Sequence, residues 1–214
     1  MGRASSQTVA KRDEPGGHPG GDPLVARRRL LDALLESIGQ KGFRATTVTD
    51  IVRLARTSRR TFYEWFETRE ECYLALIDAS DLDMHAKVGG AVDPGAPWTE
   101  QIRQATAAYV DHVAANPVLT LTSIRELPSL GEPALVQDRR TLDAFADLLS
   151  GIVDNPRFRE AGVRPVSRYT AQLLLGGIKE LTAMVVEDGG DVREMTETIV
   201  QAALALLRPA PIPD

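Results

Sequence analysis

Residues 57–66 read TSRRTFYEWF, which places four of the chain's eleven aromatic residues directly behind two arginines. On a helix, where successive residues are about 100° apart, Phe62 and Phe66 fall on one side. Arg60 and Glu64 fall on nearly the opposite side. The stretch therefore predicts a short helix with a buried aromatic side and an exposed polar side that carries the arginines.

Capping signals around this stretch predict several consecutive helices. Thr47 followed by Asp50 has the spacing of a capping box, and Ser58 is a good N-cap for the helix that ends near residue 66. Thr68 and Glu71 repeat the capping-box spacing at the start of a longer helix. Only a two-residue break separates the second and third helices, as in a helix-turn-helix.

The charge of the chain is unevenly distributed. The whole chain carries a formal charge of −5, but residues 24–70 contain ten basic and six acidic side chains. Residues 71–214 contain twelve basic and twenty-one acidic side chains. A basic module on an acidic body is the asymmetry expected when only one part of a protein meets phosphate groups.

In a helix-turn-helix, the N-terminal end of the second helix enters the major groove of DNA. Arg59 and Arg60 occupy that end, and arginine can bind guanine with two hydrogen bonds. Tyr63 and Trp65 lie at the edge of the basic face, where their polar groups can reach phosphate. Two other readings remain open. The arginines of an amphipathic helix can simply face water, or the basic face can dock an acidic partner in a helical adaptor protein.

Helical periodicity continues to the end of the chain, so we predict an all-α fold. Residues 1–23 are rich in Gly and Pro and predict a disordered tail, with a minor-groove arm as the alternative. We expect a DNA-binding domain at 24–69 and a helical ligand-binding and dimerisation domain at 70–214. Two helices, 166–187 and 192–207, are expected to end the chain.

Several protein classes are excluded by what the sequence lacks. No apolar run approaches the roughly 18 residues that span a bilayer, and no catalytic, phosphate-loop or dinucleotide motif occurs. We therefore expect neither an enzyme nor a membrane protein, and no metal or cofactor. The single Cys72 fits a cytoplasmic protein and is interpreted as a small, partly buried apolar residue, with a redox sensor as the alternative.

Polar and aromatic residues in the predicted body are candidates for a small-molecule pocket between helices. Each of them is also compatible with an ordinary packing or surface position. The candidates are Trp98, Tyr109, His112, Arg125 and Glu126.

The first of the two final helices is apolar around most of its circumference, and its glycines permit close approach of a neighbour. This composition favours a dimer contact, and a helix buried within one chain is the alternative. The residues concerned are Leu173, Leu174, Leu175, Gly176, Gly177 and Leu181.

The run TTVTDIVRLARTSRRTFYEWFETREECYLALI, residues 46–77, resembles the helix-turn-helix and the start of the fourth helix of TetR-type bacterial transcriptional repressors. The resemblance covers roughly residues 24–77. It implies a homodimer whose last two helices form the interface, a palindromic double-stranded DNA operator, and release by a small-molecule effector.

The resemblance also implies roles for individual residues. Thr47, Tyr63, Trp65 and Arg69 are expected to hold phosphates, and Thr49, Arg59, Arg60, Thr61 and Glu64 to approach base edges. With the capping Ser58, the predicted DNA-binding set is Thr47, Thr49, Ser58, Arg59, Arg60, Thr61, Tyr63, Glu64, Trp65 and Arg69. The sequence departs from the family pattern in two places. Arg56 stands in the turn where glycine is usual, and Trp65 replaces a histidine.

Overall fold

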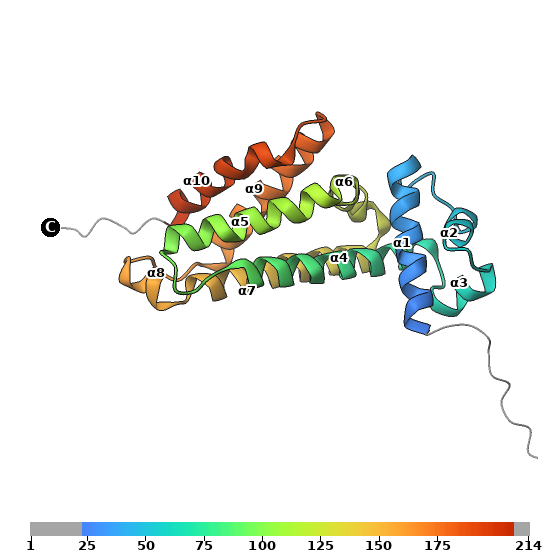
Figure 1. Cartoon of the computed structure of the whole chain (residues 1–214), viewed down its shortest axis with the longest axis horizontal. Helices are drawn as coiled ribbons and strands as arrows, with labels where there is room; N and C mark the ends of the chain where they lie inside the picture. The colour runs from blue at the N-terminus through green and yellow to red at the C-terminus, as the bar shows by residue number, and fades with distance from the viewer. Residues whose placement is uncertain (1–22, 208–214) are drawn as a thin grey trace, which may run out of the picture.

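The structure, a computed structural model, describes residues 23–207, and every regular element in this range is a helix. The all-α prediction is therefore confirmed. The predicted tail and its possible minor-groove arm lie outside the described residues, apart from Pro23, which begins the first helix. Figure 1 shows three N-terminal helices grouped at one end of an elongated bundle formed by the remaining helices.

The N-terminal module consists of α1 (Pro23–Lys41), α2 (Val48–Leu54) and α3 (Arg59–Trp65). Thr47 and Asp50 form the predicted capping box of α2, and Ser58 caps α3. The three helices meet in a core in which Leu34, Ile51 and Phe62 are fully buried. The capping residues thus set where the helices begin, and the buried apolar side chains pack the three helices against one another.

The body begins with α4, whose N-cap is Thr68, as predicted. The Glu71 carboxylate accepts the backbone N–H of Glu67 instead of that of Thr68, so the capping-box geometry is shifted by one residue. The helices of the body are α4 (Arg69–Ala91), α5 (Trp98–Ala115), α6 (Pro117–Arg125), η1 (Leu127–Leu130), α7 (Glu132–Val153), α8 (Pro156–Glu160), α9 (Arg168–Glu187), η2 (Val192–Met195) and α10 (Thr196–Leu207).

Two details of the body differ from what the sequence favours. The segment around Pro156 reads as a loop but forms the short helix α8, because the Asn155 side chain caps it and proline suits the first helical turn. The last predicted helix begins as the 3₁₀ turn η2 before α10 continues it.

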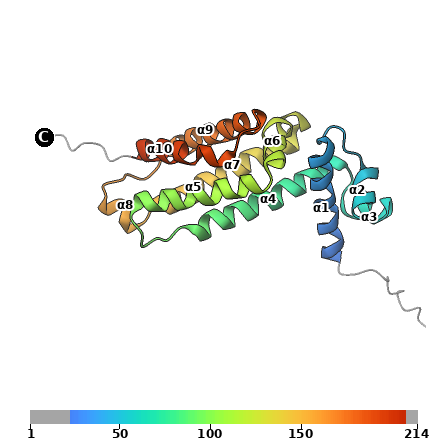
Figure 2. The ribbon, with the colours of Figure 1, turned by 45° about the horizontal axis from the view of Figure 1, so that its top comes forward.

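The hydrophobic core of the N-terminal module extends into the body. It includes Cys72 and Tyr73 of α4 and, from later in the chain, Leu119, Leu127 and Ala134. Figure 2 shows α6 and the start of α4 lying against α1. The module is therefore joined to the body by shared packing as well as by the chain itself. The predicted boundary between residues 69 and 70 stays a prediction.

None of the helices within residues 23–207 is long and apolar enough to cross a membrane.

Candidate nucleic-acid interface and effector cavity

α3 is fixed to the module by its aromatic side and by its N-cap. Phe62 and Phe66 are 0% and 3% exposed, and their ring centroids lie 5.8 Å apart. The Ser58 Oγ accepts the backbone N–H of Thr61 at 3.0 Å. The predicted division of TSRRTFYEWF into a buried and an exposed side is therefore present. The buried side holds the helix in one orientation, which is what a surface that reads another molecule needs.

The turn between α2 and α3 is made without glycine. Arg56 adopts φ +50°, the left-handed conformation that usually favours glycine. The Arg56 N–H donates to the carbonyl oxygen of Arg53 at 3.2 Å, and the Thr57 N–H donates to that of Val52 at 2.9 Å. These two bonds form a Schellman motif, which ends α2 and redirects the chain into α3.

A side chain from α1 supports this turn. The Arg29 guanidinium donates hydrogen bonds to the carbonyl oxygens of Ala55 and, at 3.3 Å, of Arg56. Carbonyl groups at a helix C-terminus lack partners within the helix, and a nearby cation also interacts favourably with the helix dipole. Arg29 thus stabilises the turn. Nothing in the sequence around residue 29 indicates this contact, because its partners lie more than 25 residues away.

The opposite side of α3 is polar and open to solvent. The Arg60 side chain is 83% exposed, and its Nε lies 3.1 Å from the Glu64 carboxylate. Tyr63 is 55% exposed. Arg59 donates to the Thr49 hydroxyl at 2.5 Å, so the first turns of α2 and α3 are linked at the surface. These predicted contact residues therefore form one continuous surface.

The remaining predicted contact residues border this surface. Thr47 and Ser58 are exposed but are also engaged as N-caps. Thr61 is half-buried beneath the Ser58 hydroxyl, 3.0 Å away. Trp65 is half-buried and packs against the core of the module, which leaves part of its ring system at the surface. All four are therefore placed beside the surface formed by Arg60 and Tyr63.

Arg69 has a different environment from the one that phosphate binding requires. Its guanidinium donates to the carbonyl oxygen of Thr46 at 2.6 Å and of Phe43 at 3.2 Å, and it lies 4.3 Å from the centroid of the Phe43 ring. It also pairs with Glu70. Through these contacts Arg69 links the start of α4 to the loop between α1 and α2. The DNA surface that we propose does not include it.

The charge of the module surface is not neutralised by the module itself. Arg53, Arg56, Arg59 and Arg60 are all exposed. Within residues 23–207, neither Arg56 nor Arg59 has a carboxylate partner, and Arg53 lies 3.9 Å from Asp50, at the limit of an ion pair. Exposed arginines without acidic partners favour binding of an anionic ligand such as a phosphate backbone.

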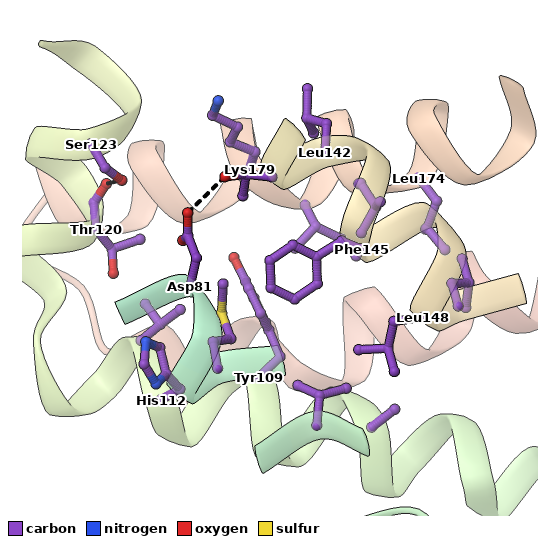
Figure 3. A pocket seen from close by; sticks show the side chains of 18 of the residues that line it. Asp81, Tyr109, His112, Thr120, Ser123, Leu142, Phe145, Leu148, Leu174 and Lys179 are labelled. Atoms are coloured by element: carbon purple, nitrogen blue, oxygen red, sulfur yellow. Dashed lines mark hydrogen bonds between the residues drawn. The ribbon is translucent and has the colours of Figure 1, made fainter. Parts of the chain in front are cut away.

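The body contains a cavity of about 190 Å³ between α4, α5, α6, α7, α9 and α10. In Figure 3 its polar side chains gather towards one end, around Asp81, Thr120 and Ser123. Phe145 and Leu174 lie towards the other end. A closed apolar cavity of about 150 Å³ is large enough to hold benzene, so this one has room for a small organic molecule.

Two of the five predicted pocket residues line this cavity. Tyr109 donates to or accepts from the Thr182 hydroxyl at 2.8 Å, and His112 lies 3.2 Å from the Ser80 hydroxyl. The other three do not line it. Trp98 packs on Phe158, Arg125 pairs with Glu180 and Glu187, and Glu126 pairs with Arg44.

The most polar residues of the cavity are ones that the sequence analysis did not select. Asp81 accepts a hydrogen bond from the Thr141 hydroxyl at 2.7 Å, and Lys179 pairs with Asp138 at 2.5 Å. The sequence does mark Asp81 as an unusual position. It stands at helical spacing between the apolar residues Ile77, Met84 and Val88, where a carboxylate is unexpected.

Cys72 does not have the environment of a reactive thiol. It is fully buried, and burial raises the pKa of the thiol to about 12. A thiolate is needed for oxidation, and it is scarce when the pKa is this high. The interpretation as a small buried residue is therefore favoured over a redox sensor.

The outer face of α9 carries exposed apolar side chains. Tyr169, Leu173 and Met184 are 82%, 66% and 51% exposed. A Cβ atom added at Gly176 or Gly177 would meet no atom within 4 Å, so packing within this chain does not require glycine at either position. Leu174, in contrast, is buried on the inner face. The predicted apolar circumference of this helix is thus divided between the core and an uncovered outer face.

A helix-turn-helix with an exposed basic surface, joined to a helical body with a cavity, is the architecture of a bacterial transcriptional regulator. Comparison with known proteins agrees. Residues 30–76 match the family described as bacterial regulatory proteins, tetR family. This match covers the helix-turn-helix and the start of α4, and within these residues it agrees with the resemblance that the sequence shows.

Individual relatives extend the comparison. The chain is 26% identical over 109 residues to an uncharacterized HTH-type transcriptional regulator, YhgD, of Bacillus subtilis, and 35% identical over 71 residues to the transcriptional regulator AcuR of Cereibacter sphaeroides. These matches cover 51% and 33% of this chain, and span only 56% and 32% of the relatives' lengths. Both relatives are described as transcriptional regulators.

Solved structures resemble the whole described chain. The regulator FadR of Bacillus subtilis, solved in complex with stearoyl-CoA, superposes with a TM-score of 0.72 and 17% identity. The match covers 86% of this chain and 99% of FadR. FadR of Bacillus halodurans gives the same TM-score at 16% identity, over 84% of this chain and 97% of the other. At this level of identity the likeness concerns the fold.

Proposed function

We propose that the chain is a cytoplasmic, homodimeric transcriptional repressor that binds a palindromic operator and is released by a small molecule held in the body. The observation that carries the proposal is the exposed side of α3. It presents Arg59 and Arg60 at the helix start, where a helix-turn-helix meets base edges. Tyr63 and the exposed part of Trp65 lie beside them and suit phosphate contacts.

A homodimer is supported by the uncovered face of α9. Tyr169, Leu173 and Met184 are exposed at helical spacing on this face, which also carries two glycines and the Glu180 carboxylate. Exposed apolar side chains at helical spacing favour a protein partner, and glycines without internal contacts permit a second helix to approach closely. A two-fold axis through this face would present two copies of α3, so half-sites about 34 Å apart or a multiple of that distance are expected.

A route from the cavity to the DNA surface is supported by shared side chains. Ile77, Leu119 and Leu127 line the cavity and also belong to the core of the N-terminal module. Arg44 of the module and Glu126 at the end of α6 add an ion pair of 2.7 Å across the same junction. A ligand that repacks these side chains would change the position of the module and shift the population away from the DNA-binding arrangement.

A small-molecule effector is also compatible with the likeness to FadR, which was solved with stearoyl-CoA. That ligand is a property of FadR. For this chain it supports only the general point that a body of this fold can hold a ligand, and the chemistry of the ligand is argued separately below.

The proposal is tested by selecting bound sequences from a random pool of double-stranded DNA with the full chain. We expect a palindrome to be enriched, and its affinity to fall with salt by about 0.9 log units per phosphate contact per log unit of salt. Enrichment of no sequence would contradict operator binding. A helical adaptor for an acidic protein, the second candidate, would instead retain no DNA from the pool at physiological salt.

A further inference from the structure

The polar end of the cavity contains a carboxylate without a cationic partner. Asp81 is half-buried on α4 and lines the cavity, and its hydrogen-bond donor is the neutral Thr141 hydroxyl, 2.7 Å away. No Lys, Arg or His within residues 23–207 lies within ion-pair distance of it. Figure 3 shows the Asp81 side chain pointing into the space between Thr120 and Phe145. A carboxylate in such a place is costly unless a ligand supplies the missing donor.

The other titratable groups at this end do not neutralise Asp81. Lys179 of α9 is held by Asp138 of α7 at 2.5 Å, so this pair contributes no net charge. Burial, followed by the nearby Lys87, lowers the pKa of His112 on α5, so its imidazole is neutral near pH 7. Asp78, one turn earlier on α4, is exposed, and the nearby Arg140 and Arg27 offset its charge. The polar end therefore carries a net charge of about −1.

The rest of the cavity is apolar. Phe145, Leu148 and Ile152 of α7 face Val88 of α4 and Leu174 of α9 across it. These side chains offer no hydrogen-bond partners, so they suit a hydrocarbon segment of a ligand. The cavity thus has one end for a charged group and one for an apolar body.

We propose that the cavity binds an amphiphilic monocation, with a protonated nitrogen against the Asp81 carboxylate and a hydrocarbon body along α7. A cation brings the charge of the polar end to about zero, whereas a carboxylate or phosphate ligand would bring it to −2 or beyond. Burial raises the pKa of Asp81 to about 6, so the carboxyl is still mostly ionised at pH 7.5. The inference rests on the proposed function only in treating this cavity as the effector site.

The test compares three ligands that share one hydrocarbon chain and differ only in the head group. Hexylamine, hexan-1-ol and hexanoate carry charges of +1, 0 and −1 at pH 7.5, and six carbon atoms match the benzene-sized room of the cavity. Isothermal titration calorimetry of the full chain is expected to give the order amine, then alcohol, then carboxylate. The amine should bind at least about tenfold more tightly than the alcohol, as expected for a hydrogen bond to a charged group.

Asp81→Asn keeps the shape of the side chain and an oxygen that can accept the Thr141 hydroxyl, but removes the charge. It should abolish the advantage of hexylamine over hexan-1-ol and leave the affinity for hexan-1-ol unchanged within about threefold. Retained alcohol binding shows that the cavity is intact. Asp78→Asn is the matched control, because it removes one charge from the same helix at a residue that does not line the cavity. It should keep the wild-type order.

Three outcomes would overturn the inference: hexanoate binding as tightly as hexylamine, hexylamine failing to bind, or Asp81→Asn retaining the preference for the amine. Operator binding separates these outcomes from failure of the proposed function. If hexanoate both binds preferentially and releases the selected DNA, the repressor proposal stands and the inference about ligand charge is wrong. If hexylamine binds with the expected preference but no DNA is selected, the ligand inference stands and the repressor proposal is wrong.

Discussion

Arg56→Gly is expected to stabilise the protein, although it removes a charged side chain from a helix-turn-helix. Arg56 is the only residue other than glycine with positive φ within residues 23–207. A residue with a Cβ atom in this conformation costs about 1–2 kcal/mol relative to the right-handed form. Glycine removes that cost but adds about 0.4–1 kcal/mol of entropy to the unfolded chain. From the middle of both ranges, the net gain in the free energy of unfolding should be about 0.8 kcal/mol.

Two further variants separate the backbone effect from loss of the side chain. Arg56→Ala keeps the Cβ atom and should change stability by less than about 0.5 kcal/mol, as is usual for an exposed position. Arg53→Gly places glycine inside the regular helix α2, also at an exposed arginine, and should destabilise by about 1 kcal/mol.

The assay is urea denaturation followed by circular dichroism at one fixed protein concentration, because dimerisation makes apparent stability depend on concentration. In thermal unfolding, a gain of 1 kcal/mol should raise the Tm by about 2–4 °C for a chain of this size. The reasoning is refuted if Arg56→Gly and Arg56→Ala are equally stable, since the left-handed conformation would then carry no cost.

Two other predictions concern the body. Burial raises the pKa of Asp81 from 3.8 to about 6. This shift lowers the free energy of unfolding by up to about 3 kcal/mol above pH 6, and the loss disappears as the pH falls towards 4. In the ligand-free protein, Asp81→Asn should therefore raise the Tm at pH 8 and much less at pH 4.5; an equal effect at both would contradict the assignment. Leu173→Arg, at an exposed position of α9, should leave folding nearly unchanged but give a monomeric mass in light scattering, and a retained dimer would remove α9 from the interface.

The N-terminal module was predictable from sequence because its signals are local. Caps at Thr47, Ser58 and Thr68 act over three residues, and the spacing of Phe62 and Phe66 sets the buried side of α3. Each of these features is fixed by helix geometry alone. Helical periodicity likewise predicts the last two helices, 166–187 and 192–207, which the structure forms as α9 and as η2 with α10.

The turn before α3 and the role of Arg69 could not be predicted, because both depend on contacts between distant residues. The sequence shows that glycine is missing at position 56, but the support comes from Arg29 on α1. The phosphate contact that the family resemblance implies for Arg69 stays a prediction. In the structure its guanidinium donates to carbonyl oxygens of the loop between α1 and α2, and no pattern near residue 69 reveals these contacts.

The cavity was only partly predictable for the same reason. Trp98 and Arg125 were selected by residue type, yet one packs on α8 and the other forms surface ion pairs. The packing of six helices decides which of their faces surround the cavity, and the sequence of one helix alone does not show it. Asp81 is the one cavity residue whose unusual position can be recognised in the sequence alone, because it is a carboxylate within an apolar helical stripe.

The central claim is that the start of α3 reads DNA bases, and Arg60→Ala tests it most directly. Arg60 is 83% exposed and only pairs with Glu64 on the same helix, so its loss should change stability by less than about 0.5 kcal/mol. The measurement is fluorescence anisotropy of the selected operator and of operators with single base changes. Arg164→Ala is the control for loss of one charge, because Arg164 is exposed and follows α8, which lies at the end of the body away from the N-terminal module (Figure 1).

We expect Arg60→Ala to weaken operator binding by about 1–3 kcal/mol and to lose discrimination at one base pair in each half-site, while Arg164→Ala binds like the wild type. Unchanged affinity and unchanged base preference in Arg60→Ala would contradict the account.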